Sequence, residues 1–274
     1  MDEIDLIGKY EEKPFPKLRE MVVDTVEQGL KRHHMKGLIE LDVTKAREYI
    51  RKHKEKTGEE LSFTGWIIKC IGQAVNEHKH VQALRKGKKI VIFDDVDISV
   101  MVERVVDDNL FPVIFVVRKA NEKSFREIHN EIRTTQVQTG KDYLKKRESR
   151  RAKMLLSLPK FLRSFFFWRK IRKDPFFVKK YLGTAGVTSI GMYGKGRTSW
   201  PITVSNQPLF FALGGIAKKP GVIGDKIEIR EYLDMTILID HDLVDGAPAA
   251  RFISRLAELV ENAFGLARMS ENDK

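Results

Sequence analysis

The sequence predicts an α+β fold, in which helices and strands follow one another without strict alternation. Amphipathic helical segments are interspersed with runs of consecutive strands, whereas a fold built from βαβ units would alternate the two throughout. The 274 residues are 42% hydrophobic, which suffices for a substantial core, and they contain no internal repeat and no long flexible linker. We therefore expect a single domain over residues 1–274.

Each predicted element follows from the spacing of its apolar residues and from the residues at its boundaries. Apolar residues recur with helical spacing over 15–33, and the charged stretch 44–57 predicts a surface helix. Ser62 and Ser124 are placed to cap the two helices that follow them, and a last helix begins near Pro248. Strands are predicted over 37–43, 89–93, 96–102, 110–117, 186–194, 210–216, 225–230 and 234–240.

The net charge of +12 is concentrated in one segment. Residues 141–180 carry fifteen Lys or Arg against three acidic residues, which leaves the remainder of the chain neutral. This distribution indicates a near-neutral body with a basic, aromatic-rich insertion at about 141–182. We therefore consider nucleic acid an unlikely partner, since no nucleic-acid-binding motif accompanies the charge.

The single cysteine and the apolar segments indicate the cellular compartment in which we expect the protein. Cys70 lies in an apolar run, so we expect a buried, inert thiol; one cysteine allows no intramolecular disulfide and no cysteine-based zinc site. The first residues are acidic and lack a secretory pattern, and no segment approaches the length of a transmembrane helix. A cytoplasmic protein, or one peripheral to a membrane, is the expectation.

The stretch DHDLVDGAPAARF, residues 240–252, places His241, Asp245 and Gly246 between a predicted strand and a predicted helix. A histidine mounted there suits a general base, because its neutral form is populated near pH 7 and the strand end fixes its position. Gly246 would add backbone freedom. A structural histidine in a solvated turn is the alternative interpretation.

This stretch closely resembles the D-H-R-x-x-D-G-x-x-x-A-x-F signature of the dihydrolipoamide acyltransferase catalytic domain, which forms the core of 2-oxo acid dehydrogenase complexes. The resemblance implies a two-layer sandwich like that of chloramphenicol acetyltransferase, with a mixed sheet, assembled as a trimer with its active sites at subunit interfaces. Further segments match the family in the same order: FPKLREMVVDTV, ELDVT, SFTGWIIKCIGQAVNEHKHVQA, VDISVMVE, LFPVIFVVRKANEKSFREIHNEI and GTAGVTSIGMYG.

The same resemblance implies roles for individual residues. His241 would take the proton from the thiol of CoA or of a dihydrolipoyl-type acceptor, so that the thiolate attacks the acyl thioester. Thr188, with Ser189 beside it, would donate a hydrogen bond to the oxyanion. Asp245 would brace the active-site loop through an ion pair with Arg19.

Coenzyme A would thus be a substrate, and no metal is expected. In the glycine-rich stretch after the Thr188 strand, Lys195 and Arg197 are candidates for contacting a CoA phosphate.

Three features depart from the family pattern. Asp242 stands where the family has an arginine, and a carboxylate close to an imidazole raises the pKa of that imidazole. The chain shows no lipoyl domain, so a lipoyl-bearing protein would act in trans. The basic segment replaces a shorter connection.

These departures leave alternatives open. The acceptor could be a hydroxyl or an amine, or the chain could be a non-catalytic, membrane-associated scaffold. The basic segment could form a structural lid or subunit contact, a membrane-binding surface over 150–180, or a site for a protein partner or nucleic acid.

Overall fold

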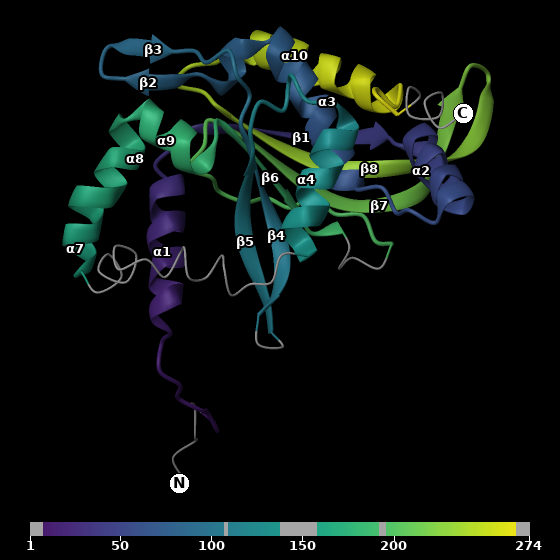
Figure 1. The fold of residues 1–274 in the computed structure, drawn as a ribbon. Helices are drawn as coiled ribbons and strands as arrows, with labels where there is room; N and C mark the ends of the chain where they lie inside the picture. The colour runs from purple at the N-terminus through teal and green to yellow at the C-terminus, as the bar shows by residue number, and fades with distance from the viewer. Residues whose placement is uncertain (1–7, 107–108, 138–157, 192–195, 267–274) are drawn as a thin grey trace, which may run out of the picture.

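A computed structural model of the chain describes residues 8–106, 109–137, 158–191 and 196–266. Its centre is a six-stranded sheet with the order β1-β8-β7-β6-β4-β5 (Figure 1). Strand β6 runs parallel to both of its neighbours, and the other pairs are antiparallel. This mixed sheet confirms the predicted α+β class. The strands are β1 (His34–Asp42), β4 (Ile98–Val106), β5 (Asn109–Val117), β6 (Ala185–Ser189), β7 (Leu209–Ile223) and β8 (Lys226–Asp240).

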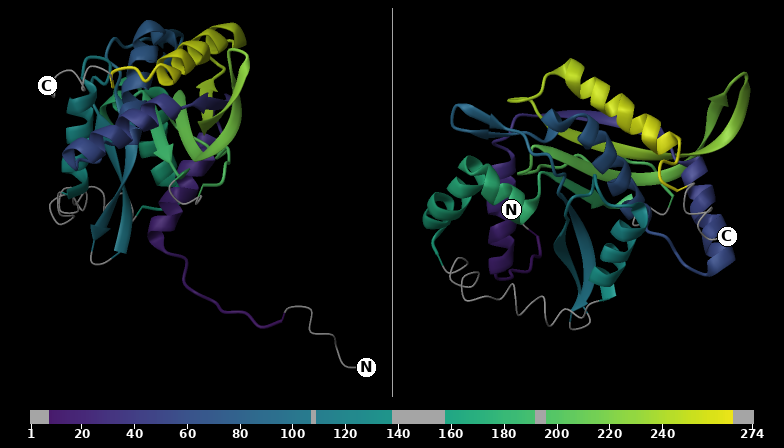
Figure 2. Two further views of the ribbon diagram at one scale, coloured as in Figure 1. Left: turned by 90° about the vertical axis from the view of Figure 1, so that its right-hand side faces the viewer. Right: turned by 45° about the horizontal axis from the view of Figure 1, so that its top comes forward.

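The core lies between this sheet and the helices that pack on one of its faces (Figures 1 and 2). These helices are α3 (Phe63–Glu77), α4 (Phe125–Val137) and α10 (Gly246–Glu261), while α2 (Thr44–Thr57) lies at one end of β8. The side chains of Trp66, Phe211 and Phe252 are fully buried between the two layers. The helices therefore form a layer on one face of the sheet, and they leave the other face uncovered.

Alternation along the strands determines which side chains point away from these helices. In β1, Leu41 packs in the core, whereas Leu38 is half exposed on the opposite face. The register pairs Thr188 with Ala212 and Ala212 with Thr236, while the neighbouring Val187 lies opposite the core residue Phe211. Thr188 therefore lies on the face that the helices leave open, which we call the open face.

Several predicted boundaries were wrong, and the strand expected over 186–194 already ends at Ser189. The stretches 210–216, 225–230 and 234–240 belong to one long hairpin, β7–β8, whose outer part extends past the sheet and exposes Ile227 and Ile229. The first helix, α1, covers Lys17–Gly29 and ends before 33, because His34 already begins β1. The apolar side chains of Val22, Val23 and Val26 in this helix, and of Leu30 just after it, are exposed, so no core within the described residues receives them.

Other local predictions were confirmed. The α2 helix spans the residues expected from the charged stretch. The Ser62 Oγ accepts a hydrogen bond from Gly65 N at 3.1 Å, and Ser124 Oγ accepts one from Glu127 N at 3.3 Å. Cys70 is buried, and burial raises the pKa of its thiol, in agreement with an inert role.

The described part of the basic segment is helical. It comprises α7 (Lys160–Arg163), a π-helical turn η2 (Ser164–Trp168), α8 (Arg169–Lys173) and α9 (Pro175–Leu182). Trp168, Ile171 and Val178 form a small second core with Leu84 of the strand β2. The short elements that support it are η1 (Lys79–Gln82), β2 (Leu84–Lys86) and β3 (Lys89–Val91). The first half of the predicted insertion, up to residue 157, lies outside the described residues.

Candidate active site

His241 lies in the turn that leads from β8 into α10. Its backbone N–H donates a hydrogen bond to His33 O at 2.9 Å, and the preceding Asp240 N donates one to Pro208 O at 2.9 Å. The His241 side chain is 51% exposed, so its imidazole faces solvent in the isolated chain. The backbone is thus fixed while the ring is accessible, as a general base requires.

Asp245 is the nearest acidic partner of this imidazole. The His241 Nδ1 lies 4.0 Å from Asp245 Oδ1, and the Asp245 side chain is 90% exposed at the N-cap position of α10. Gly246 begins the helix without a positive φ, and a Cβ there would meet no atom within 4 Å. Within one chain, no steric reason for a glycine is therefore present at this position.

Arg19 lies in the first turn of α1, at the end of that helix opposite to the His241 turn (Figure 1). About ten residues of helix, roughly 15 Å, separate Arg19 from Gly29, after which the chain reaches His33. Over the described residues, no ion pair joins Arg19 to Asp245. One chain alone does not bring these two residues together.

The carboxylate of Asp242 is occupied by another histidine. His33 Nδ1 lies 2.9 Å from Asp242 Oδ1, and this hydrogen bond and the charge of Asp242 raise the pKa of His33. Beside it, Arg32 Nη1 donates to Asp240 Oδ2 at 2.6 Å. The residue that replaces the family's arginine therefore pairs with His33.

Thr188 and Ser189 point to opposite faces of β6. The register places Ser189 beside Leu213, a core residue, whereas Thr188 borders a hollow of about 370 Å³ on the open face. The hollow is largely apolar, with Met101, Ile114 and Phe210 among its lining residues. Of the two hydroxyls, that of Thr188 is therefore the one directed toward this hollow.

One chain does not bring Thr188 and His241 together. Thr188 lies two strands across from Thr236, which precedes His241 by five residues along β8. With about 3.3 Å per residue and 4.8 Å between strands, roughly 19 Å separate the two positions. A base and an oxyanion donor that serve one reacting carbonyl must both lie within hydrogen-bond distance of it.

The expected phosphate contacts are placed differently. Lys195 lies outside the described residues. Arg197 is exposed, and its backbone carbonyl lies so close to Gly215 that a Cβ added to that glycine would come within 1.9 Å of the carbonyl oxygen. A hollow of about 170 Å³ beside the His241 turn is richer in cations, with Lys31, Arg32, Arg85 and Arg172 on its wall. Sequence reasoning missed these four residues, because they come from distant parts of the chain and form no motif.

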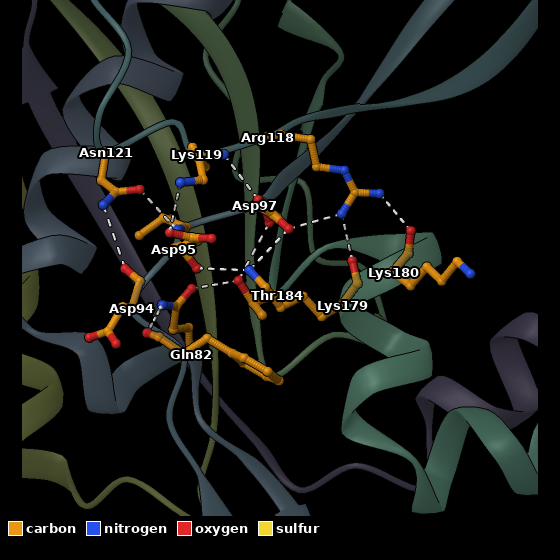
Figure 3. A network of polar contacts seen from close by, with 12 residues as sticks. Gln82, Asp94, Asp95, Asp97, Arg118, Lys119, Asn121, Lys179, Lys180 and Thr184 are labelled. Carbon is orange, nitrogen blue, oxygen red and sulfur yellow. Dashed lines mark hydrogen bonds and ion pairs between the residues drawn. The ribbon is translucent and has the colours of Figure 1, made fainter.

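Three acidic residues that precede β4, Asp94, Asp95 and Asp97, form an anchor for cations (Figure 3). Asp97 accepts hydrogen bonds from Arg118 Nη1 and from Lys119 N, both at 2.9 Å. Burial raises the pKa of Asp97, but the hydrogen bonds from Lys119, Arg118 and Lys179 outweigh it, so the pKa is lowered overall. Among the described residues, no group of three potential ligands could hold a metal ion.

The chain belongs to the family of 2-oxoacid dehydrogenase acyltransferases (catalytic domain), whose model matches residues 7–157 and 181–267. A similar curated protein is the lipoamide acyltransferase component of the branched-chain alpha-keto acid dehydrogenase complex of Bacillus subtilis (strain 168). It is 25% identical over 234 residues, which are 84% of this chain and 47% of that protein. The chain thus spans about half the length of this relative.

Solved structures show the fold. The cubic core of a pyruvate dehydrogenase multienzyme complex aligns with a TM-score of 0.67 and 18% identity, covering 97% of this chain and 98% of that chain. The dihydrolipoamide acetyltransferase of Azotobacter vinelandii, studied for the catalytic roles of a serine, a histidine and an asparagine, aligns with a TM-score of 0.66 and 19% identity. This alignment covers 97% of this chain and 98% of that one. The family and the acyltransferase fold expected from the sequence are confirmed.

Proposed function

We propose that this chain transfers an acyl group between CoA and a thiol acceptor of the dihydrolipoyl type, with His241 as general base. The observation that carries the proposal is the mounting of His241, whose backbone is fixed by His33 O while its ring stays open to an incoming thiol. Family membership supports the reaction class. A metal plays no part in the proposed chemistry.

Two side chains, those of His241 and Thr188, suffice for the proposed transfer. His241 Nε2, the ring nitrogen opposite the one that faces Asp245, takes the proton from the acceptor thiol, and the thiolate sulfur attacks the thioester carbonyl. The Thr188 hydroxyl donates a hydrogen bond to the oxyanion that forms. When the intermediate collapses, the C–S bond to CoA breaks and the His241 proton passes to the CoA sulfur.

A complete site requires two copies of the chain in this proposal. The separation of roughly 19 Å within one chain supports a site in which His241 of one subunit faces Thr188 of its neighbour. The open face, with Leu38, Met101 and Ile114 exposed, offers apolar surface for such a contact. A homotrimer, or a larger assembly of trimers, is the arrangement that we infer.

The remaining assignments are extensions of the same proposal. The cations around the smaller hollow, Lys31, Arg85 and Arg172, would hold the phosphates of CoA close to the His241 turn. Arg19 and Asp245 would pair only in the assembled protein. We infer one catalytic domain over 1–274, with an insertion at about 141–182, and a lipoyl-bearing protein as the acceptor in trans.

Acyl transfer to dihydrolipoamide from a panel of acyl-CoAs, followed by mass spectrometry, tests the proposal. His241→Ala should lower the rate by about 10²–10⁴-fold, and Thr188→Val by about 10²–10³-fold, while Thr188→Ser keeps a hydroxyl and most of the activity. His33→Ala is the control, because His33 provides a second accessible imidazole beside the same turn, 74% exposed, that takes no part in the proposed chemistry. Equal turnover by His241→Ala and the wild type would overturn the assignment of the base.

A further inference from the structure

The helical segment 158–182 is the part of the described chain that differs most from the family. The family's model leaves residues 158–180 unmatched. Its first three pieces, α7, η2 and α8, form a continuous helix from Lys160 to Lys173 that lies beside α1 at the edge of the molecule (Figures 1 and 2). A role for this segment must therefore be derived from its own side chains.

The inner face of this helix is fixed to α1. The Arg163 side chain, 5% exposed, donates from Nε to Asp24 Oδ2 at 2.9 Å and from Nη1 to Glu20 Oε2 at 3.0 Å. Trp168 and Ile171 are buried on the same face, in the small second core. These contacts determine which side of the helix faces outward.

The far end of the segment is fixed as well, at the anchor shown in Figure 3. Arg118 donates to the last carbonyls of α9, Lys179 O at 2.7 Å and Lys180 O at 2.5 Å, and Lys179 Nζ lies 3.0 Å from Asp97 Oδ2. Ion pairs of Arg163 and Lys179 therefore hold both ends of the segment. The helix cannot rotate to turn its outer side chains inward unless these ion pairs break.

The outer face is aromatic and cationic. Phe161, Phe165 and Phe166 are 69%, 59% and 60% exposed, and the π-helical turn holds the two adjacent phenylalanines outward together. One helical turn further along, Arg169, Lys170 and Lys173 are exposed, and so is Arg172, which lines the hollow beside the His241 turn. Between 158 and 173 there is no acidic residue, so nothing within the helix neutralises this face.

This pattern reverses the usual surface helix and matches one that lies in a membrane interface. Such helices place bulky apolar side chains at the boundary of headgroups and acyl chains, with Lys and Arg beside them attracted to anionic lipid. Among the described helices, none is long and apolar enough to span a bilayer, so the contact would be peripheral. Symmetric contact between two copies would oppose identical rows of cations.

We infer that the outer face of helix 160–173 docks this protein on the surface of anionic phospholipid bilayers. The phenylalanines enter the interface, and Arg169, Lys170 and Lys173 pair with lipid phosphates. The inference is independent of the acyl transfer proposed above, because none of these side chains belongs to the candidate active site.

Co-sedimentation of the full chain with vesicles tests this inference. Vesicles of phosphatidylglycerol and phosphatidylcholine should bind the wild type at least about tenfold more tightly than phosphatidylcholine alone, and added salt should weaken the binding. The double variant Phe165→Ser/Phe166→Ser should lose about tenfold in affinity. Its control is Ile227→Ser/Ile229→Ser, which removes two even more exposed apolar side chains from the β7–β8 hairpin and should bind like the wild type.

A second pair of variants tests the charge. Arg169→Glu/Lys173→Glu should abolish the preference for phosphatidylglycerol, whereas Lys45→Glu/Lys226→Glu, with the same change in net charge on distant exposed residues, should largely preserve it. Equal binding by all variants would overturn the inference. It would also be overturned if the phenylalanine variant changed the oligomeric mass, or if single-stranded nucleic acid bound in preference to the vesicles. All variants alter exposed side chains, and an unchanged melting temperature would verify their folding.

Discussion

Two inactive variants of this chain should restore activity to each other when they assemble together. His241→Ala removes the base and leaves Thr188, while Thr188→Val removes the hydroxyl and leaves His241. If each site takes His241 from one subunit and Thr188 from its neighbour, a mixed trimer contains some sites that carry both intact residues. Each variant alone contains none.

The magnitude follows from the positions of the two residues. Roughly 19 Å separates them within one chain, which is too far for both to act on one carbonyl. With equal amounts of both variants and random assembly, half of the neighbouring pairs provide an intact His241 and half of those an intact Thr188. About a quarter of the wild-type activity per site should therefore return in the unselected population, and about a third in isolated trimers that contain both variants, because each of these has one intact site out of three.

Co-expression of the variants with two different affinity tags, followed by sequential purification on both, isolates the mixed assemblies. Acyl transfer to dihydrolipoamide is then compared with each variant purified alone and with a mixture made after assembly. Mixed assemblies that are no more active than the parent variants would refute a site shared between subunits. Recovery in the mixture made after assembly would instead reveal subunit exchange.

Three further predictions concern stability and titration. Arg163→Met should destabilise the fold by about 3–5 kcal/mol in urea unfolding, because it leaves the buried Asp24 carboxylate without its partner. Glu59 has a pKa lowered to about 2, first by the hydrogen bond from Arg126, so its contribution is present above pH 4.5 and is lost as the pH falls toward 2. Since the Glu59 side chain is 37% exposed, screening reduces this contribution to about 1 kcal/mol, and Glu59→Gln should flatten the acid limb of a stability profile by that amount. Asp242→Asn should lower the pKa of His33 toward its ordinary value in an NMR titration, because it removes the carboxylate whose hydrogen bond and charge raise that pKa.

Each of these predictions has a control. Arg163→Met/Asp24→Leu replaces the whole ion pair with apolar groups and should regain most of the stability lost by the single change. Glu55→Gln, on an exposed carboxylate of α2, should leave the acid limb unchanged. An unaltered His33 titration in Asp242→Asn would show that Asp242 does not hold this histidine in solution.

Local signals in the sequence were sufficient for most elements. Ser62 and Ser124 cap their helices because the serine hydroxyl satisfies backbone donors within three residues, a contact that the sequence displays directly. The position of His241 after a strand was predictable as well, because the apolar run just before it is also a local signal in the sequence. The β7–β8 hairpin was not, because the outer half of β8 is exposed while the inner half is buried on both faces, so one strand carries two different patterns.

Contacts between distant residues explain the rest. The sequence places a carboxylate next to His241, but it does not show that His33 reaches Asp242 from the start of another strand. The basic hollow likewise joins Lys31 from the turn after α1, Arg85 from β2 and Arg172 from α8. Neither arrangement has a periodicity or spacing from which it could be inferred.

The parallel placement of β6 has a consequence for how such a chain can acquire new parts. Because β6 runs parallel to β4 while β5 runs antiparallel to it, β5 ends and β6 begins at the same end of the sheet, where Val117 and Ala185 both pair with Ile98. The segment 158–182 lies in this connection from β5 to β6, so additional helices there lengthen an excursion at one end of the sheet without altering any strand pairing. A family that varies at this point can change what its members contact while the sheet, and the threonine strand within it, stays the same.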